Sequence, residues 1–410
     1  MIFKNVNVNE VQNRELAEIV RQLRKLTDGG YDLYDKNDKA ILRLLKKALK
    51  MAKDEKEWYI YFDGLFDIIY QYGRSGNDRQ IVRYAEIYYK DSELYMDKVL
   101  PDYAHTDLAF LNTWIYDMIF DAYEEYCQID DAKMKTFMEK YEEAGLKYGK
   151  AYCYYNDEMS LALLYRDKKL AEHGRKYFEK YEKELASCYV CGHKVYLGYY
   201  LLFGQREKAE KQMLDFINKN IPKRHQWCYQ YCESAAAGNM YKSVLNYCIL
   251  LGRVEDFHYF YKKYWEKQPR ENWYGEEGDG WETFSAYLCA ISGNFDFLEK
   301  NIEQAMNDIK ECGTYSTIAN MKDGIEWYCY FTLLEKSGIT EVAMKLPGVV
   351  SDGDGMIPCG AVIEYMNAFG DDYGKKFEKA RAEFDFLRAK RAYLECAGLF
   401  EPPLPEFGAG

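Results

Sequence analysis

Four cysteines in two closely spaced pairs are the residues best suited to chemistry in this sequence. The pairs are Cys188 with Cys191 and Cys228 with Cys232. Thiolates at such short spacings can each supply ligands to a tetrahedral zinc ion. Other cysteines, such as Cys248, stand alone before a glycine turn, where a thiol packs as a small apolar group. We therefore predict a packing role and no bound metal or other cofactor, with a zinc site as the alternative.

A glycine- and acid-rich stretch at 266–282 holds aromatic residues that no helical pattern explains. Its aromatic residues include Trp273, Tyr274 and Trp281, and its acidic residues include Glu276, Glu277 and Asp279. Long loops in compact proteins are often functional, so we predict that these aromatic side chains contact a ligand. Carboxylates beside aromatic rings also occur on carbohydrate-handling surfaces. An enzyme built on an α/α scaffold and acting on carbohydrate is therefore one alternative.

Motifs for common catalytic reactions are incomplete in this chain. The run Gly-Leu-Lys-Tyr-Gly-Lys-Ala at 145–151 is shorter than a phosphate-binding loop and has alanine in place of its Ser/Thr. The chain contains 5 histidines, which leaves little acid–base capacity near neutral pH. We predict that the protein is not an enzyme.

The net charge and the distribution of apolar residues indicate which classes of partner to expect. The 410 residues include 41 tyrosines, and 55 Lys+Arg against 67 Asp+Glu give a net charge of −12. Binding to a nucleic-acid backbone needs a basic surface, so we predict no nucleic-acid partner. Neither a signal peptide nor an apolar run of membrane-span length is found, which predicts a cytoplasmic protein with no membrane partner.

Helices must position these residues, because apolar side chains recur at helical spacing along nearly the whole chain. No run alternates β-branched residues between hairpin turns, so we predict no strands. Turn glycines follow apolar helices at Gly76, Gly204, Gly252, Gly293 and Gly338, and further turns are expected near 128–131 and 166–167. The last four glycines recur at intervals of roughly 40–50 residues, and a period in this range with two helices per unit predicts an α-solenoid.

Two segments resemble tetratricopeptide (TPR) repeats. Residues 204–209, followed by Pro222, look like the second half of a repeat, and residues 241–248 look like the first half. The small residue of the first helix is replaced by Leu245, so the repeats are divergent. The resemblance covers residues 54–347 and implies an all-α, right-handed superhelical solenoid of about seven TPR-like repeats with helical caps. We expect a cap at 1–53, repeats at 54–347, a loop with capping helices at 348–398 and an extended tail at 399–410.

The TPR resemblance also implies a concave groove lined by the first helix of each repeat. Ligand contacts in that family lie ten and six residues before the turn glycine. The groove residues carried over in this way are Lys194, Lys242, Asn246, Tyr70, Tyr287 and Tyr328. Lys242 with Asn246 matches a Lys-x-x-x-Asn pair with which some family members hold a peptide carboxylate, since an ammonium and an amide can both donate to it.

The implied function is a non-enzymatic scaffold that binds a protein or peptide segment in an aromatic-rich groove. A bacterial-type regulatory sensor for a small peptide, without its own DNA-binding domain, is an alternative that the resemblance also allows. The proline-rich stretch at 402–405 is a further candidate for docking in a groove of this kind.

Overall fold

The chain is almost entirely helical. The computed structural model describes residues 3, 6–27, 31–74, 78–95, 98, 114–120, 122–124, 131–148, 150–184, 188–230, 232, 236–268, 282–296, 317–346, 349, 351 and 354–400. Regular structure within these ranges is helical except for one short β-ladder, which confirms the predicted all-α class. None of the helices in these ranges combines the length and the apolar character needed to cross a membrane.

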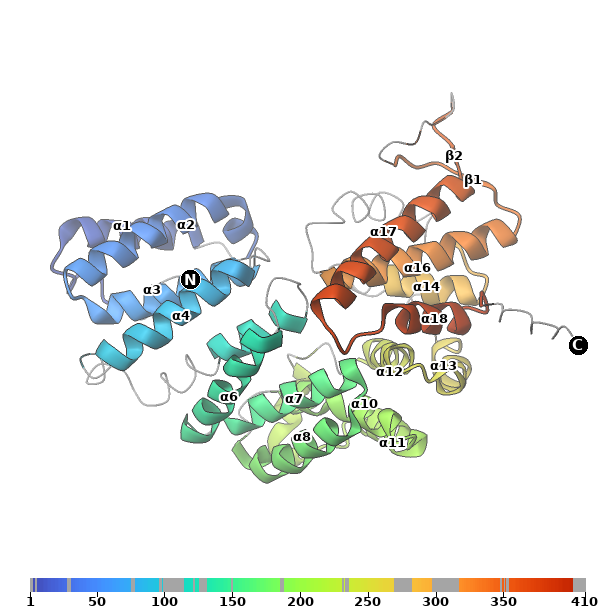
Figure 1. The fold of residues 1–410 in the computed structure, drawn as a ribbon, viewed down its shortest axis with the longest axis horizontal. Helices are drawn as coiled ribbons and strands as arrows, with labels where there is room; N and C mark the ends of the chain where they lie inside the picture. The colour runs from blue at the N-terminus through green and yellow to red at the C-terminus, as the bar shows by residue number, and fades with distance from the viewer. Residues whose placement is uncertain are drawn as a thin grey trace, which may run out of the picture. The chain divides into compact units, whose positions relative to one another are not determined.

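Two compact units make up the chain, residues 1–157 and 158–410, and Figure 1 labels their helices and strands. Helices of the first unit are α1 (Arg14–Thr27), α2 (Tyr31–Asp54), α3 (Trp58–Arg74), α4 (Asp78–Tyr95) and α6 (Asp131–Tyr148), and α7 (Ala151–Tyr165) crosses the boundary. Helix α2 packs against α1 and α3, and α3 packs against α4. The residues expected to form an N-terminal cap therefore pack directly on α3, within one core.

The second unit continues as consecutive helices. They are α8 (Lys168–Tyr181), α9 (Tyr189–His193), α10 (Val195–Leu202), α11 (Arg206–Ile217), α12 (Ala237–Leu251), α13 (Val254–Phe260), α14 (Glu282–Ile291), α16 (Thr317–Lys336), α17 (Cys359–Ala380) and α18 (Phe386–Cys396). Short 3₁₀ segments occupy Glu182–Glu184 and Lys223–Gln230, and α13 continues as one π-helical turn, Tyr261–Trp265. Helix α10 packs against α11 and α12, and α16 packs against α14 and α17.

The predicted glycine turns share one backbone geometry. Gly204, Gly252, Gly293 and Gly338 have φ values of 70°, 66°, 71° and 98°. In each case the glycine N–H donates to the carbonyl three residues earlier, and the next N–H donates to the carbonyl five residues before it. This pair of hydrogen bonds satisfies the last carbonyls of a helix. It requires a residue in the left-handed conformation, which glycine adopts without strain. These four turns are confirmed, and Gly76 lies outside the described residues.

Arg166 makes the same turn without a glycine. Its φ is 57°, and the N–H of Asp167 donates to the carbonyl of Ala162 at 2.9 Å. The Arg166 guanidinium compensates for the strain by donating twice to the carbonyl of Leu250, at 3.0 and 2.7 Å. The turn after α7 therefore also caps the C-terminal end of α12.

A small antiparallel ladder interrupts the helices near the C-terminal end of the second unit. β1 (Glu341–Val342) pairs with β2 (Ile357–Pro358), with Glu341 opposite Pro358 and Val342 opposite Ile357. The prediction of no strands is wrong at this point, because two residues per strand are too few to produce a visible alternation. β1 precedes the predicted C-terminal segment 348–398, and β2 lies within that segment and leads directly into α17.

Many of the tyrosines hold one helix to the next. Tyr88, Tyr141, Tyr155, Tyr287 and Tyr330 are among the largest side chains that are almost fully buried. The hydroxyls of the last four donate to groups outside their own helices, as in Tyr330, which donates to the carbonyl of Phe295 at 3.0 Å. A buried phenol supplies a large apolar area and keeps one polar contact. The excess of tyrosine is therefore mainly a feature of the core.

Candidate functional site

Two of the predicted groove residues lie in the interior. Lys242 is 1% exposed and Tyr287 is 0% exposed. The Tyr287 hydroxyl donates to the backbone carbonyl of Tyr393 in α18 at 2.8 Å. Neither side chain offers an accessible polar atom to a ligand on the surface, so in the folded chain both act as packing residues.

The chain's own C-terminal helix, α18, covers the face on which these residues were expected to bind a ligand. Asn246 shares a small cavity with Ala389 and Tyr393 of α18. Tyr328 lies beneath Lys390, whose Nζ is 5.6 Å from the ring centroid. The helix also packs against α12, α13 and α16. In this unit, α18, which was predicted as a capping helix, therefore lies on the predicted groove positions. Repeat spacing alone does not reveal this.

The remaining predicted contacts are dispersed. Lys194 is half-buried at the junction of α9 and α10. Tyr70 belongs to the first unit, where its ring lies 5.3 Å from that of Trp114 and forms a half-buried aromatic cluster with Phe66. Trp273, Tyr274, Trp281 and the acidic residues beside them lie outside the described residues. The described structure therefore does not bring the six groove residues into one site.

An open depression on α13 and its π-helical turn is better placed to meet a partner. Its volume is about 410 Å³. The lining residues are Glu255, His258, Tyr259, Lys262, Lys263 and Lys267. We call this surface the lysine depression. It gathers positive charge on a chain whose net charge is −12, and all three of its lysines are exposed.

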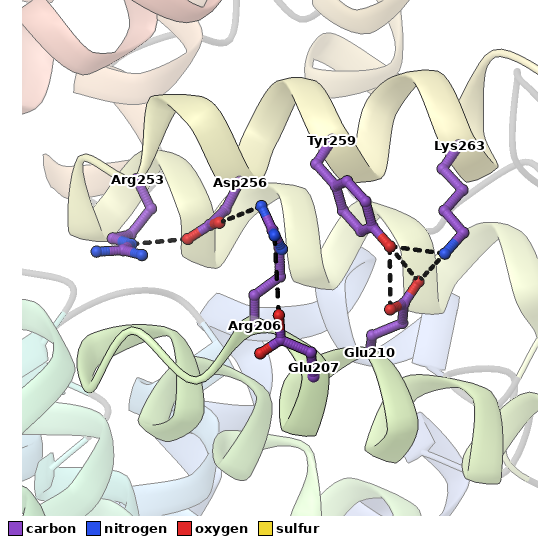
Figure 2. Close-up of polar contacts among 7 residues, drawn as sticks. All are labelled: Arg206, Glu207, Glu210, Arg253, Asp256, Tyr259 and Lys263. Carbon is purple, nitrogen blue, oxygen red and sulfur yellow. Dashed lines mark hydrogen bonds and ion pairs between the residues drawn. The ribbon is translucent and has the colours of Figure 1, made fainter.

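Glu210 of α11 positions one edge of the lysine depression (Figure 2). Its carboxylate accepts hydrogen bonds from Lys263 Nζ at 2.6 Å, from the Tyr259 hydroxyl at 3.0 Å and from the Tyr264 hydroxyl. The guanidinium carbon of Arg206 lies 4.5 Å from the Tyr259 ring centroid, at cation–π distance. Tyr259 is thus held between two helices with its ring at the rim.

Asp256 anchors the other end of the same helix pair (Figure 2). Its side chain is 5% exposed and accepts from Arg253 Nε at 2.7 Å, while Arg206 Nη1 approaches to 3.5 Å. A buried carboxylate needs such partners, because its desolvation is otherwise costly. Glu210 and Asp256 therefore join α11 to α13, while Glu255 is exposed in the lining of the depression.

The charge of the lysine depression depends on which of its titratable groups are ionised and which are already paired. Burial, together with the charge of Lys262, lowers the pKa of His258, so its imidazole is neutral at neutral pH. No ion pair to Lys262 or Lys267 is found among the described residues. These two ammonium groups can therefore donate to an acidic ligand.

Stability is expected to depend on pH through Glu210. Burial opposes ionisation, but hydrogen bonds from Lys263, Tyr264 and Tyr259 outweigh it and hold the pKa of this carboxyl below its ordinary value of 4.5. A lowered folded-state pKa contributes stability that is present above pH 4.5 and is lost as the pH falls through the folded-state value. We expect Glu210→Gln to lower the free energy of unfolding by about 1–2 kcal/mol at pH 7, and by less at pH 3.

Denaturant unfolding at both pH values measures this effect. Glu207→Gln on the same helix is the control, because the Glu207 side chain is 80% exposed and lies 3.8 Å from Arg206. The control variant is expected to change stability by about 0.5 kcal/mol or less. An equal loss at pH 3 and pH 7 for Glu210→Gln would contradict the assigned ionisation.

The four candidate zinc ligands lie at α9 and at the 3₁₀ segment Lys223–Gln230. Cys188 is the N-cap of α9 and Cys191 lies within it, whereas Cys228 lies within the 3₁₀ segment and Cys232 follows it. The sulfur atoms of Cys188, Cys191 and Cys232 lie within 4.8 Å of one another. Cys228 is buried beside them, and its sulfur accepts a hydrogen bond from the Tyr189 N–H at 3.2 Å. The structure therefore brings together the two cysteine pairs, which are separated by some forty residues in the sequence.

No known protein found by comparison helps to interpret the lysine depression or the cysteine cluster. Comparisons of the chain with protein-family models, with curated proteins and with solved structures give no match. Sequence reasoning missed the lysine depression, although Lys262, Lys263 and Lys267 are close together in the sequence. The sequence does not show that the surface is hollowed here, nor that Glu210 and Asp256 are paired within the protein.

Proposed function

We propose that this chain is a non-enzymatic scaffold that binds an acidic protein or peptide segment at the lysine depression. The observation that carries the proposal is the open depression of about 410 Å³ with three exposed lysines and a fixed tyrosine ring at its rim. Ammonium groups donate to carboxylates, and a ring held in place loses little conformational freedom when a ligand covers it. The ligand class is thus an acidic segment in place of the carboxyl terminus expected from the groove residues.

The proposed architecture is a TPR-like α-solenoid, a right-handed superhelix of about seven helical hairpins. It is supported by one turn geometry that recurs at Arg166 and at four glycines with the same pair of backbone hydrogen bonds. Close stacking supports it as well: a Cβ at Gly198 of α10 would lie 2.4 Å from Leu163 of α7 and 2.8 Å from Tyr247 of α12. Scaffolds of this kind present long surfaces for protein segments.

Net charge does not oppose an acidic ligand at this place. Charges on the surface act over about 8 Å at physiological ionic strength, so the nearest groups decide the local attraction. Glu210 and Asp256 are already paired with Lys263, Arg253 and Arg206, and the one acidic residue of the lining, Glu255, stands against the two exposed ammonium groups of Lys262 and Lys267. Lys262 and Lys267 therefore dominate the local field, and binding is expected to weaken as salt is added.

Charge reversal tests the proposal. The double variant Lys262→Glu/Lys267→Glu is expected to bind a fluorescent peptide rich in Asp and Glu about tenfold more weakly than wild type, which corresponds to about 1.4 kcal/mol. Fluorescence anisotropy at two salt concentrations gives the affinities. Lys375→Glu/Lys379→Glu is the matched control, because both of its lysines are exposed on α17. No binding by the wild type, or an equal loss in the control, would overturn the proposal.

A further inference from the structure

The cysteines of the second unit fall into two groups by burial. Among the described cysteines of this unit, six are at most 1% exposed, namely Cys228, Cys248, Cys289, Cys329, Cys359 and Cys396. Cys191 is exposed, and Cys188 and Cys232 are only partly buried. An exposed thiol gains little from packing, so the packing role that explains the first group does not explain why these three lie together.

The arrangement of the three sulfur atoms matches a tetrahedral metal site. Cys191 Sγ lies 3.4 Å from Cys232 Sγ, and Cys188 Sγ lies within 4.8 Å of both. Zinc–sulfur bonds of about 2.3 Å in a tetrahedron place neighbouring sulfurs about 3.8 Å apart. Changes of up to about 1 Å in these separations, within the reach of side-chain rotation, would bring the three sulfurs to that spacing.

Cys228 is the natural fourth ligand. It lies one helical turn before Cys232, whose N–H donates to the Cys228 carbonyl at 2.8 Å, so the two side chains share a face. The Cys228 sulfur lies outside the set of three that are mutually within 4.8 Å, so it has to turn toward them to complete a tetrahedron. This sulfur accepts from the Tyr189 N–H at 3.2 Å, a contact that orients a ligand sulfur as outer-shell partners of metal sites do.

The two nearby histidines are engaged elsewhere. His193 places Nδ1 2.9 Å from the carbonyl of Tyr189, and its Nε2 lies 3.4 Å from Glu182. His225 accepts a hydrogen bond at Nε2 from Arg224 at 2.9 Å. These contacts favour a ligand set of four thiolates over a set of three thiolates and a histidine.

We infer that Cys188, Cys191, Cys228 and Cys232 form a structural zinc site. A closed set of four protein ligands leaves no position for substrate, which is typical of structural zinc. The elements it joins are short: α9 has 5 residues and the 3₁₀ segment Lys223–Gln230 has 8. Such short helices are marginal alone, so a metal link between them stabilises a part of the unit where long paired helices are lacking.

Metal binding by the full chain tests the inference. Protein purified without chelator is expected to carry about one zinc per chain by mass spectrometry of the metal. Cobalt(II) added to the metal-free chain is expected to give thiolate charge-transfer absorption and the intense visible bands of a tetrahedral ion. Cys191→Ser and Cys232→Ser are each expected to weaken cobalt binding by about tenfold or more.

Two further variants separate ligation from loss of folding. Cys153→Ser is the control, because Cys153 is also partly buried but lies outside the cluster, and it is expected to bind cobalt as wild type does. Cys191→His is expected to keep the metal with a shifted visible spectrum, since imidazole replaces one thiolate. Circular dichroism confirms that each variant is helical.

Three results would overturn the inference. The first is the absence of both zinc and a thiolate–cobalt spectrum in wild-type protein. The second is a Cys191–Cys232 disulfide, detected by mass and reversed by dithiothreitol, in a chain that binds no metal after reduction. The third is an equal loss of cobalt binding in Cys153→Ser, which would place the metal elsewhere.

Discussion

Replacing Gly324 with alanine is expected to lower the free energy of unfolding of the second unit by about 2 kcal/mol. Helices α16 and α17 cross so closely at this point that a Cβ on Gly324 would lie 2.6 Å from both the Cα and the N of Gly370. Backbone atoms cannot rotate away, so the helices must separate across a core that includes Trp327 and Phe331. This overpacking costs about 3 kcal/mol and exceeds the gain of about 1 kcal/mol in helix propensity.

Gly360→Ala is the matched control for this crossing. Gly360 lies in α17, but its Cβ would have only Glu335 Oε1, at 3.7 Å, within contact distance. Alanine there is expected to leave stability unchanged or to raise it by up to about 1 kcal/mol. Urea unfolding of both variants measures the difference, and a Gly324→Ala protein as stable as wild type would contradict the close crossing.

Removal of the Asp256 carboxylate is also expected to lower the stability of the second unit markedly. Asp256→Ala leaves Arg253 and Arg206 without the acceptor that they share and removes an acidic group from the first turn of α13. The change removes charge-assisted hydrogen bonds to a carboxylate that is 5% exposed and costs about 2 kcal/mol, while water solvates the two partly exposed guanidinium groups that remain. Thermal unfolding is expected to show a lowered Tm, with weaker binding of the acidic peptide as α13 loosens from α11.

An exposed ion pair provides the comparison. Asp372 on α17 pairs with Lys376 at 2.5 Å, but its side chain is 60% exposed, against 5% for Asp256. Asp372→Ala is expected to change stability by about 0.5 kcal/mol or less, because water screens the pair and replaces its hydrogen bonds. Similar losses in the two variants would mean that the burial of Asp256 does not decide its contribution.

Helices and their turns were predictable because they depend on local chemistry. The glycines at 204, 252, 293 and 338 terminate helices through bonds within six residues, and the left-handed conformation that these bonds require is available to glycine at little cost. Arg166 occupies the same conformation without being a glycine. Its position depends on a carbonyl in α12, 84 residues away, so no local rule marks it.

The ligand-contacting residues were less predictable, since access depends on what covers a helix. Lys242 and Tyr287 occupy the expected helical positions, yet both are buried. Tyr393 and Lys390 of α18 meet the positions that were to form the groove. Spacing along the chain assigns a face to each residue but does not say which distant helix lies against that face.

By itself, the sequence determined the all-α class, the helical hairpins and the pairing of cysteines at ligand spacing, because each of these depends on neighbours within a few residues. Only the tertiary structure decided which polar groups remain accessible. It placed α18 over the expected groove, paired Glu210 and Asp256 internally, and left Lys262 and Lys267 at an open surface. Burial and charge pairing depend on contacts between segments that are distant in sequence, and these contacts form only when the chain folds.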